Sequence, residues 1–474
     1  MSDKRIIIIG AGPAGISAAK FLSEQGAHNV TLLEAGDRPG GKCTSVNYGG
    51  LWHELATSYS AWGYNTLHRW FNQHAIAVYK VKPLRMLVKS GNKLATVTLK
   101  EYALGGLTIQ HKRRAISQLF KFQRLWLRFF FHELRGSKNT DINQKLAMPF
   151  GEWLDFYQLD IVKRFAGRAI VSAGYGYLET VPALHCLRWL RPSIIIAGLF
   201  GQVWEPVPGF ENALRAFSWD QDIRYNKPVK QVLHENGCVR VVCEDGEELI
   251  CDDVIVACPL SQAKSFFPET SVQYKLGSAM NSHQYATIFF KIKGRLLDGD
   301  NETIGLPDNF PLSQAGKPLV IRRTGNKIPA KAVNADGNEE YYVSYHYKSD
   351  LTEEKLTEYL NEAIIELGGQ LETVLEIRQF NYMQTYDKQA ITSGLVQKLN
   401  QQQGEQHIWF STASMSFESV DNIMDQNEEL VHSLLDGNKP HHSESKNRIY
   451  WIKLSRLFKP ITFIRYWRKT QINI

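Results

Sequence analysis

The sequence predicts an α/β protein with a parallel-sheet domain and a second, α+β domain. The first observation is the segment IIIIGAGPAG at residues 6–15, in which an apolar strand runs directly into a glycine-rich turn. The second is the return of short apolar strands at residues 253–258 and 407–410. The third is the composition between them, which changes to alternating strands and basic helices. Buried apolar strands joined through helices are typical of a parallel sheet, so these segments predict a Rossmann-like domain interrupted by an inserted domain.

The glycine spacing in the first turn predicts a bound dinucleotide. Gly10 permits a tight turn, Gly12 leaves room for a pyrophosphate beside the backbone, and Gly15 lets the next helix lie against the strand. The helix predicted at residues 14–25 begins with amides that can hold phosphate oxygens, and the strand at residues 30–33 brings a carboxylate to the ribose hydroxyls. An empty glycine turn is the alternative, but the order of strand, turn, helix, strand and acid argues against it. The predicted contacts are Gly10, Gly12, Pro13, Ala14, Gly15, Glu34 and Ala35.

A second glycine pair indicates which dinucleotide is bound. Residues 35–45 read AGDRPGGKCTS, with a lysine directly behind two glycines. This stretch resembles the glycine–glycine–basic loop that FAD enzymes of the flavin amine oxidase superfamily carry after the ribose-binding acid. The resemblance implies FAD as the cofactor and adds Gly40, Gly41 and Lys42 to its contacts. An ordinary surface turn with a solvated lysine is the alternative.

Composition limits the class of protein. A chain of 474 residues with 43% hydrophobic and 22% charged residues is long and apolar enough for two or three folded domains. The chain opens with MSDKR and enters its first strand at once, so no secretory segment is expected and a cytoplasmic location is predicted. The longest apolar run, residues 193–200, is too short to span a bilayer and is expected to be a core or pocket element. The six cysteines form no C-x-x-C pair, so neither disulfides nor a metal site are predicted.

The inserted domain is predicted to begin near residue 78, after a helix at residues 66–75. Residues 78–99 have the pattern of short antiparallel strands around a turn at residues 89–92. A helix at residues 114–135 then carries its cations on one narrow face, and apolar side chains occupy most of the remainder. Two interpretations stay open: a domain helix with a solvated basic face, or a membrane-facing helix beside a substrate entrance. The cations are Arg114, Lys121, Arg124, Arg128 and Arg135, and the apolar residues are Leu119, Phe122, Leu125, Trp126, Phe129 and Phe130.

Two later segments resemble the parts that return amine oxidases to their FAD domain. Residues 204–214 contain a glycine turn and a helix, and in the superfamily a residue at the place of Val229 packs over the adenine. The segment at residues 407–420 is predicted as a strand, a loop and a helix start directed at the flavin end of the cofactor. The predicted contacts in this loop are Thr412, Met415, Ser416 and Phe417. The predicted domains are residues 1–77, 205–260 and 401–437 for FAD, residues 78–204 and 261–400 for the substrate, and residues 438–474 as a tail.

Three motifs together resemble bacterial FAD proteins related to polyenoic fatty acid isomerase. They are GGKCTS at residues 40–45, the glycine loop of residues 174–176 followed by VPA at 181–183, and MSF at 415–417. The resemblance implies a two-domain fold with a long apolar pocket, in which oxidised flavin takes a hydride from a bis-allylic carbon and returns it to another carbon. Arg85 lies where that family carries its substrate-binding arginine and is predicted to anchor a carboxylate, although an arginine in a strand is usually a surface residue. Tyr175, in the glycine loop, is the second catalytic candidate.

The chain departs from that family at two positions. Thr412-Ala413 replaces a Gly-Glu pair, so the acid that binds the flavin chain is missing and lower cofactor affinity is expected. Gly198 stands where a family aromatic shapes the pocket, so a wider pocket is expected. The identity of the substrate is therefore not transferred from the family.

Three functions stay open at this point. The first is a FAD-dependent oxidoreductase or isomerase that uses hydride transfer between flavin N5 and an apolar, lipid-like substrate such as an unsaturated fatty acid. The second is a flavin amine oxidase or desaturase that passes electrons to oxygen or a quinone. The third is a noncatalytic, membrane-associated flavin-binding protein. The oligomeric state is left open.

The tail at residues 438–474 is predicted to be a membrane anchor. After a polar linker, apolar residues such as Leu454 and Phe458 recur at helical spacing, with Lys453 and Arg456 on the opposite side. From Lys446 onward the chain has eight Lys or Arg and no acid, which suits peripheral attachment to an anionic surface at the inner face of the membrane. A helix docked on the protein body is the alternative. No nucleic acid partner is expected, because the cations alternate with aliphatic residues.

Overall fold

The computed structural model describes residues 4–90, 93–104, 108–135, 139–293, 296, 303–325, 339–347 and 350–437. The chain divides into two compact units. Unit 1 comprises residues 1–41, 217–278 and 396–474, and unit 2 comprises residues 42–216 and 279–395. The predicted anchor at residues 438–474 lies outside the described residues.

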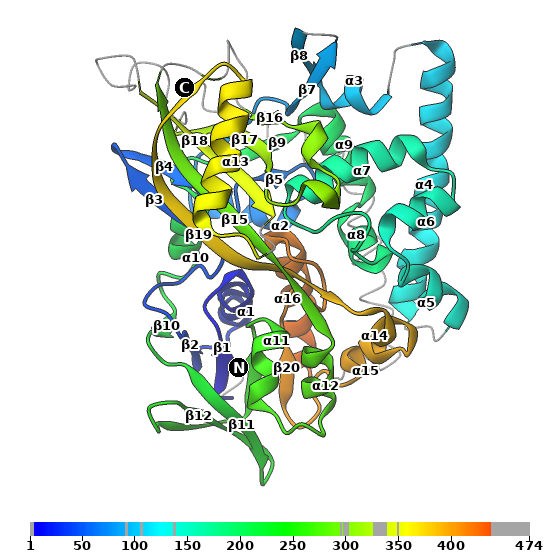
Figure 1. The fold of residues 1–474 in the computed structure, drawn as a ribbon. Coiled ribbons are helices and arrows are strands. Elements are labelled where there is room, and N and C mark those ends of the chain that lie inside the picture. Colours follow the sequence, from blue (N-terminus) through cyan, green and yellow to red (C-terminus); the bar gives the residue numbers. More distant parts are fainter. Residues whose placement is uncertain are drawn as a thin grey trace. The chain divides into compact units, whose positions relative to one another are not determined.

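Unit 1 is built on a five-stranded parallel sheet, as predicted (Figure 1). All four residues of β1 and of β14 are buried, because strands in the middle of a parallel sheet are covered on both faces. The register joins Ile6 to Val30 on one side and to Asp253 on the other. The strand order is β10 (Asp222–Arg224), β2 (Val30–Leu33), β1 (Ile6–Ile9), β14 (Asp253–Val256) and β20 (Ile408–Phe410).

Helices α1 (Pro13–Glu24) and α16 (Val420–Leu435) lie side by side in unit 1 (Figure 1). The fully buried Asn427 joins them, since its amide donates to Ala14 O at 2.7 Å and to Ser17 Oγ at 2.6 Å. The segments nearest the two ends of the chain are thereby tied together in the core. The remaining elements are the antiparallel strands β11 (Val229–Glu235), β12 (Cys238–Cys243) and β13 (Glu248–Cys251), and the helices α11 (Leu260–Ala263), η1 (Lys264–Phe266), α12 (Val272–Ser278) and α15 (Leu395–Gln401).

Unit 2 is built on a seven-stranded sheet, antiparallel except where β16 pairs with β7. Helix α13 (Glu353–Glu366) packs on this sheet, with Leu356, Leu360 and Ile364 buried in one core with sheet residues. Its first turn is capped by Thr352, whose hydroxyl accepts the Lys355 amide. The strand order is β19 (Gln370–Tyr386), β15 (Met280–Lys293), β18 (Glu339–Tyr347), β17 (Pro318–Thr324), β16 (Thr303–Gly305), β7 (Arg85–Ser90) and β8 (Lys93–Thr98).

The rest of unit 2 is mainly helical. Within the described residues no single helix is long and apolar enough to cross a membrane. One bent pair, α8 (Ala183–Trp189) and α9 (Pro192–Phe200), meets both criteria when taken together, with 66° between the two helices. Two small sheets complete the unit, β3 (Ser45–Tyr48) with β4 (Leu51–Glu54), and β5 (Ser60–Ala61) with β9 (Val203–Pro206) and β6 (Val78–Lys80). The helices are α2 (Asn65–Gln73), α3 (Leu99–Leu104), α4 (Ile109–Arg135), α5 (Thr140–Leu146), α6 (Phe150–Phe156), α7 (Asp160–Ser172), α8 (Ala183–Trp189), α9 (Pro192–Phe200), α10 (Phe210–Phe217) and α14 (Lys388–Thr392).

The unit boundaries differ from the predicted domains. Residues 42–77 and 205–216 were expected in the FAD domain, but they group with unit 2. The reason is strand pairing, because β9 pairs with both β5 and β6 and so joins these two segments in one sheet. Unit 1 also extends to residue 278 rather than 260, and its last segment begins at residue 396 rather than 401.

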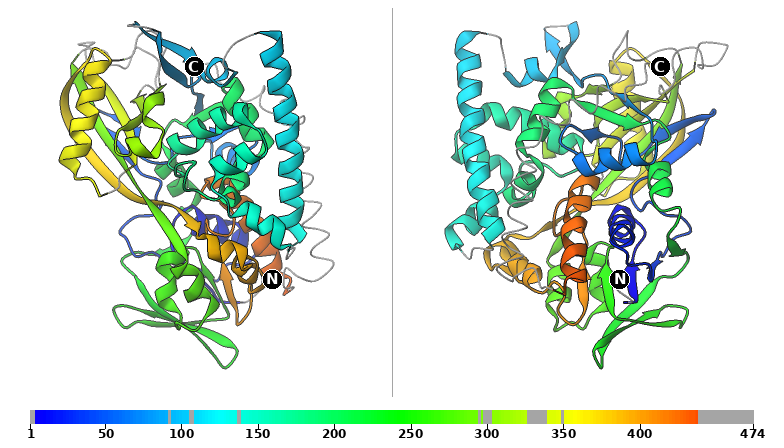
Figure 2. Two further views of the ribbon diagram at one scale, coloured as in Figure 1. Left: turned by 45° about the vertical axis from the view of Figure 1, so that its right-hand side comes forward. Right: turned by 180° about the vertical axis from the view of Figure 1, so that it is seen from behind.

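The basic helix packs into unit 2 as the first interpretation predicted. It begins earlier than expected, at Ile109. Phe122, Trp126 and Phe129 are buried, and the other predicted apolar positions are half-buried. Four of the predicted cations, Arg114, Lys121, Arg124 and Arg128, are exposed. The side chain of Arg135 lies outside the part that the structure describes. Figure 2 shows α4 in cyan beside the other helices of unit 2 in both views.

Two other predictions concern α9 and the cysteines. The run at residues 193–200 forms α9, which is a core element only in part, because Ile196 is 40% and Phe200 60% exposed.

All six cysteines are free thiols. Among the described residues, no group of three His, Cys, Asp or Glu side chains is arranged to hold a metal ion.

Four histidines of unit 2 are kept neutral by their surroundings. Burial lowers the pKa of His68, His283 and His346 to about 4. Burial, together with Arg188 and His283, lowers the pKa of His185 well below its usual value. The unfolded chain binds protons at these sites near pH 6.5, whereas the folded chain does not. Their contribution to stability is therefore complete above pH 6.5 and is lost as the pH falls toward 4.

We predict that the thermal unfolding midpoint falls as the pH is lowered from 7 to 5.5, before most carboxylates titrate. Each of these histidines contributes a slope of at most about 1.4 kcal/mol per pH unit. His346→Gln should flatten the dependence, and His28→Gln, at an exposed histidine, is the control. Differential scanning calorimetry across the pH series measures both. An unchanged slope in the His346 variant would contradict the assignment.

Candidate functional site

The first glycine turn of unit 1 excludes side chains at two of its positions. Gly10 has a φ of +106°, which L side chains rarely adopt, and its amide donates to Leu33 O at 2.8 Å. A Cβ on Gly15 would lie 1.8 Å from Gly10 O, so the start of α1 can approach β1 only with glycine there. Gly12 precedes α1 as its N-cap, and Pro13 is its first residue. The first amides of α1 have no partner within the helix, and such a helix start at a strand end can bind an anion.

The second glycine turn lies directly on the first. The Gly40 amide donates to Ala11 O at 2.8 Å. A Cβ on Gly41, whose φ is +54°, would lie 3.1 Å from the Cα of Gly12. The two turns therefore meet backbone to backbone. The sequence predicted the two glycine motifs separately, but it did not predict this contact between them.

The carboxylate of Glu34 joins the strand end to both sides of this turn. Its Oε2 accepts the Ala11 amide and its Oε1 accepts the Gly36 amide, both at 2.8 Å. Each carboxylate oxygen has a second lone pair, so these bonds leave capacity for two ribose hydroxyls. Val229 is brought to the same place, because the Lys227 amide just before it donates to Glu34 O at 2.9 Å.

The loop between β20 and α16 supplies the other predicted contacts. Thr412 is buried, and its hydroxyl has no hydrogen-bond partner within the described residues. The Met415 amide donates to Thr412 O at 3.0 Å, and Phe417 is 2% exposed. Ser419 caps the start of α16 by accepting the Asn422 amide. A buried polar group without a partner is costly, so the Thr412 hydroxyl points to a ligand in this loop.

These features fit FAD. A Cβ at Gly15 would clash with the first turn and one at Gly41 would crowd it, a carboxylate is held at the strand end, and a buried hydroxyl lacks a partner within the described residues. The absent family glutamate leaves Ala413, which is half-buried, in its place. All the predicted cofactor contacts except Lys42 belong to unit 1, namely Gly10, Gly12, Pro13, Ala14, Gly15, Glu34, Ala35, Gly40, Gly41, Val229, Thr412, Met415, Ser416 and Phe417.

Lys42, the first residue of unit 2, lies 5.3 Å from the ring centroid of Tyr382. Tyr382 belongs to a group of six rings that we call the tyrosine cluster. Its central member, Tyr285, stacks on Tyr382 at 5.6 Å and meets Tyr347 edge-on at 5.5 Å. Tyr177 lies 4.6 Å from Tyr347. The cluster comprises Tyr175, Tyr177, Tyr285, Tyr345, Tyr347 and Tyr382.

The glycine loop at residues 174–176 lies against this cluster. A Cβ on Gly174 would come within 3.1 Å of both Tyr382 and Tyr285, and Gly174 has a φ of +81°. Tyr175, the predicted catalytic residue, is 7% exposed and stacks on Tyr382 with centroids 6.1 Å apart. The loop therefore needs glycine so that its backbone can rest on the rings.

Two polar atoms inside this region have no hydrogen-bond partner in the described structure. They are the Tyr177 hydroxyl and His283 Nε2, and the His283 ring lies 6.1 Å from Tyr347. Burial raises the pKa of Tyr177, so its hydroxyl stays protonated, and His283 stays neutral as described above. The region can therefore offer uncharged hydrogen bonds to a ligand.

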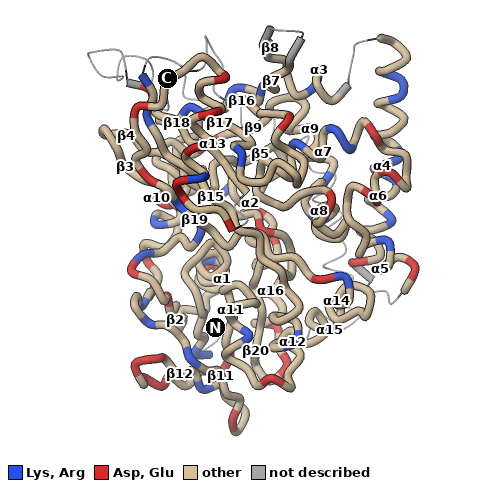
Figure 3. Tube along the Cα trace, viewed as in Figure 1, with Lys and Arg blue, Asp and Glu red and all other residues tan. Residues whose placement is uncertain are grey.

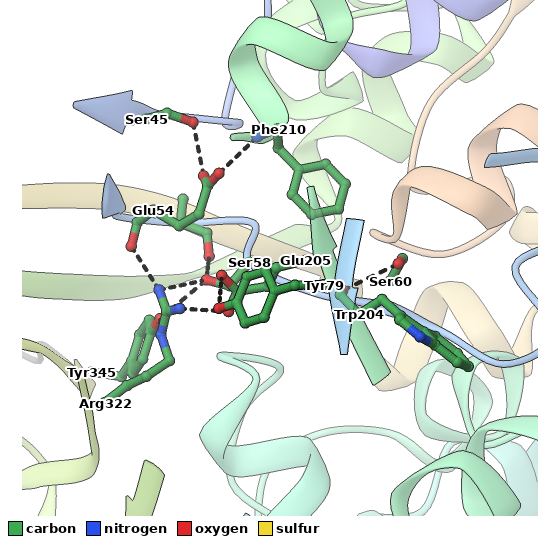
Figure 4. Close-up of polar contacts among 11 residues, drawn as sticks. Ser45, Glu54, Ser58, Ser60, Tyr79, Trp204, Glu205, Phe210, Arg322 and Tyr345 are labelled. Atoms are coloured by element: carbon green, nitrogen blue, oxygen red, sulfur yellow. Dashed lines mark hydrogen bonds and ion pairs between the residues drawn. The ribbon is translucent and has the colours of Figure 1, made fainter. Parts of the chain in front are cut away.

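A buried ion pair contacts one member of the cluster, Tyr345 (Figure 4). Arg322 is 1% exposed, and its Nη1 donates to Glu205 Oε1 at 2.6 Å. Its Nε donates to the Tyr345 hydroxyl at 3.1 Å, and its Nη2 donates to Glu54 O and Ser58 Oγ. Burial would lower the pKa of Arg322, but Glu205 and the neighbouring tyrosines outweigh it, so the guanidinium stays charged. The orientation of Tyr345 is thus fixed by a charge.

The carboxylates of Glu205 and of its neighbour Glu54 both accept hydrogen bonds from other groups of the protein. Glu205 Oε2 accepts the Tyr79 hydroxyl at 2.8 Å in addition to Arg322. Glu54 accepts Ser45 Oγ at 2.8 Å and the Phe210 amide at 2.7 Å (Figure 4). A Cβ on Gly209 would lie 2.8 Å from Glu54 Oε1, so only glycine lets α10 begin there.

Arg85 and Gly198 lie in unit 2, and their contacts there are local. Arg85 is half-buried, and its Nε and Nη2 donate to Thr96 Oγ1 and O on the neighbouring strand, both at 2.9 Å. A Cβ on Gly198 would lie 2.9 Å from the Phe165 ring. Phe165 therefore fills space that a larger residue at 198 would need.

A surface cavity of about 370 Å³ lies elsewhere on unit 2. It is lined by residues such as Leu51, Ile76 and Pro208 and includes neither Arg85 nor any member of the tyrosine cluster. We therefore do not assign it to the substrate.

Sequence reasoning missed most of the tyrosine cluster and the ion pair. The alternation at residues 341–347, YYVSYHY, places Tyr345 and Tyr347 on one face of a strand and was the available signal. The pairing of Tyr347 with Tyr285 depends on strand register across 62 residues, which no local pattern gives.

The chain is similar to a family of flavin enzymes. A model of the family "Flavin containing amine oxidoreductase" matches residues 13–317. Polyenoic fatty acid isomerase from Ptilota filicina is 24% identical over 214 residues, which are 40% of this chain and 42% of that protein. Polyamine oxidase 5 from Oryza sativa subsp. japonica is 24% identical over 290 residues, 58% of this chain and 56% of that protein. The chain thus covers only about half the length of these curated relatives.

Solved structures show the same fold. The crystal structure of a CLA-producing fatty acid isomerase from P. acnes superposes with a TM-score of 0.74 at 20% identity and covers 91% of this chain and 99% of that one. A putrescine oxidase variant gives a TM-score of 0.69 at 13% identity, with 91% and 99% coverage. The predicted amine-oxidase-type fold is therefore confirmed, and the cofactor is FAD.

We predict that Gly41→Ala lowers the FAD content of the purified protein, because the added Cβ pushes against Gly12. Gly246→Ala is the matched control, since Gly246 also has a positive φ, +88°, but has open space around it. Backbone strain of about 1–2 kcal/mol is common to both variants. Flavin absorbance per chain measures the outcome. Equal FAD content in the two variants would show that the contact between the turns is not needed.

Proposed function

Because this chain belongs to the flavin-containing amine oxidoreductase family, whose members are enzymes, we propose that it uses FAD to take a hydride from an apolar, lipid-like substrate such as an unsaturated fatty acid. Return of the hydride to another carbon would make it an isomerase. The fatty acid isomerases among its relatives and structural neighbours support this substrate class.

The observation that carries the proposal is the aromatic surface of the tyrosine cluster, beside which the two polar atoms without a partner in the described structure, the Tyr177 hydroxyl and His283 Nε2, are neutral. An ammonium substrate is best held by a carboxylate, whereas an alkyl or alkenyl chain is best held by aromatic and apolar surface. The buried carboxylates of the described part of unit 2 are Glu54, Glu205 and Glu211, and each is already hydrogen-bonded within the protein. An apolar chain is therefore the better ligand for this unit.

FAD, when bound, supplies the hydride acceptor at N5. The protein's own contribution is to hold the reacting carbon in one orientation and to exclude water. Ring surfaces of Tyr175 and Tyr382 would hold the hydrocarbon, while the Tyr177 hydroxyl and His283 Nε2 would bind a polar group of the ligand. In this proposal Arg85 anchors the carboxylate at the far end of the chain.

The activity is tested by mixing the holoenzyme with a polyunsaturated fatty acid without air. We expect conjugated-diene absorbance to rise with no net consumption of oxidant. Release of peroxide in air with a polyamine, and no change with the fatty acid, would instead establish an amine oxidase. Lasting bleaching of the flavin by the fatty acid, without conjugated product, would indicate a desaturase that needs an external acceptor.

We predict that Arg85→Ala raises the KM for the free fatty acid about ten- to a hundredfold, because a charge-assisted contact is lost. The KM for the methyl ester of the same acid should be equal in Arg85→Ala and wild type, because the ester carries no charge for Arg85 to bind. Thr96→Val is the control, because it removes a bond that Arg85 makes to its neighbouring strand but keeps the guanidinium. Steady-state kinetics on both substrates decides. A KM for the free acid that is unchanged in Arg85→Ala removes Arg85 from the site.

We also predict that Tyr177→Phe lowers kcat/KM about tenfold while FAD content stays normal, because an enclosed hydroxyl that binds the ligand is removed. Tyr359→Phe, on α13 and outside the tyrosine cluster, is the matched control. If both variants retain full kcat/KM, the Tyr177 hydroxyl does not contact substrate.

A further inference from the structure

Helix α4 carries a second apolar stripe that faces solvent. Ile109 is 71%, Ile116 55% and Phe120 66% exposed, although most large apolar residues of the described chain are buried. Their spacing of seven and four residues places them in one line along the helix. Leu127 and Phe131, both half-buried, continue the line at the same spacing. The stripe extends over about 33 Å at 1.5 Å per residue.

This stripe is distinct from the face that holds the helix on unit 2. Phe122, Trp126 and Phe129 are buried, and the Trp126 indole donates to Leu187 O at 2.9 Å. On a helix these positions point away from the stripe. The core of unit 2 therefore does not account for the exposed apolar side chains.

Cations accompany the stripe. Residues 109–132 contain six Lys or Arg and no Asp or Glu, and Figure 3 shows blue segments along α4. Arg114 is turned toward α7, where it pairs with Asp160 at 2.8 Å. The other five are exposed around the stripe, and they are Lys112, Arg113, Lys121, Arg124 and Arg128.

We propose that this face of α4 docks on an anionic lipid membrane. A helix that lies in the membrane interface combines an apolar stripe with flanking cations, and α4 has both on one exposed side. A second copy of the chain docked through the same face would place like charges together. A nucleic acid would leave Ile116 and Phe120 in water. The proposal goes beyond the catalytic function and does not depend on which substrate is used.

The contact is tested with photoactivatable phosphatidylserine in vesicles and the full-length holoprotein. After irradiation, lipid adducts located by mass spectrometry are expected in the peptides that cover residues 109–131. This assay reads contact at α4 directly, whatever the C-terminal tail contributes to attachment. Adducts confined to other peptides would overturn the proposal.

The strength of docking is measured by co-sedimentation with vesicles with and without phosphatidylserine. Replacing Ile109, Ile116 and Phe120 together by serine should weaken binding to anionic vesicles at least about tenfold, because apolar burial is lost. Trp219→Ser, at a residue 79% exposed in unit 1, is the matched control and should bind normally. Flavin absorbance and thermal unfolding confirm that both variants fold.

Two further results would overturn the proposal. Equal binding by the triple variant and wild type would show that the stripe does not enter the membrane. A lipid-free dimer that dissociates in the triple variant, measured by light scattering, would assign the stripe to contact between copies of the chain.

Discussion

The backbone contact between the two glycine turns is the constraint on which the cofactor site depends. A Cβ on Gly41 would lie only 3.1 Å from the Cα of Gly12, which is tighter than ordinary contact, and the Gly40 amide donates to Ala11 O. Glu34 bonds to Ala11 from the other side, so one short segment is held by two loops. A pyrophosphate can approach such a site because glycine backbone carries no Cβ and the helix start offers amides. At Gly41 the positive φ and the short contact both favour glycine before any ligand is considered.

Unit 2 is organised by a different kind of interaction. The Arg322–Glu205 pair is almost fully buried, and breaking such a pair typically costs about 3–5 kcal/mol because one charge is left without a partner. Its hydrogen bonds reach Glu54, Ser58 and Tyr345, which come from distant parts of the sequence. An apolar core could hold these segments together equally well, but it would not fix the hydroxyl of Tyr345. The charge therefore gives the tyrosine cluster a defined geometry.

The sequence was sufficient for the parts of the fold written in local patterns. Strands β1 and β2 and the turn at Gly10 follow from apolar runs, glycines and an acid in fixed order, so their places were predicted within a residue. The tyrosine cluster could not be predicted, because Tyr285 meets Tyr347 only through antiparallel register. Arg322 gave no signal either, since nothing near residue 322 indicates that its partner is residue 205. For the same reason the compact units change at residue 217 rather than near residue 205, because β9 pairs with strands far earlier in the chain.

Helix α4 shows how one sequence pattern can support two interpretations. Its apolar residues extend around most of the helix. The predicted apolar face contains Phe122 and Trp126, which are buried, but it does not include Ile116 and Phe120, which are exposed. The structure separates the two sets, because the first packs inward while the second lies among cations in solvent. Each set then has its own physical explanation: burial of apolar surface holds the helix in unit 2, and an anionic interface would cover the rest. A substrate that dissolves in lipid is concentrated in that same interface, so an enzyme docked through α4 would meet it there rather than extract it through water.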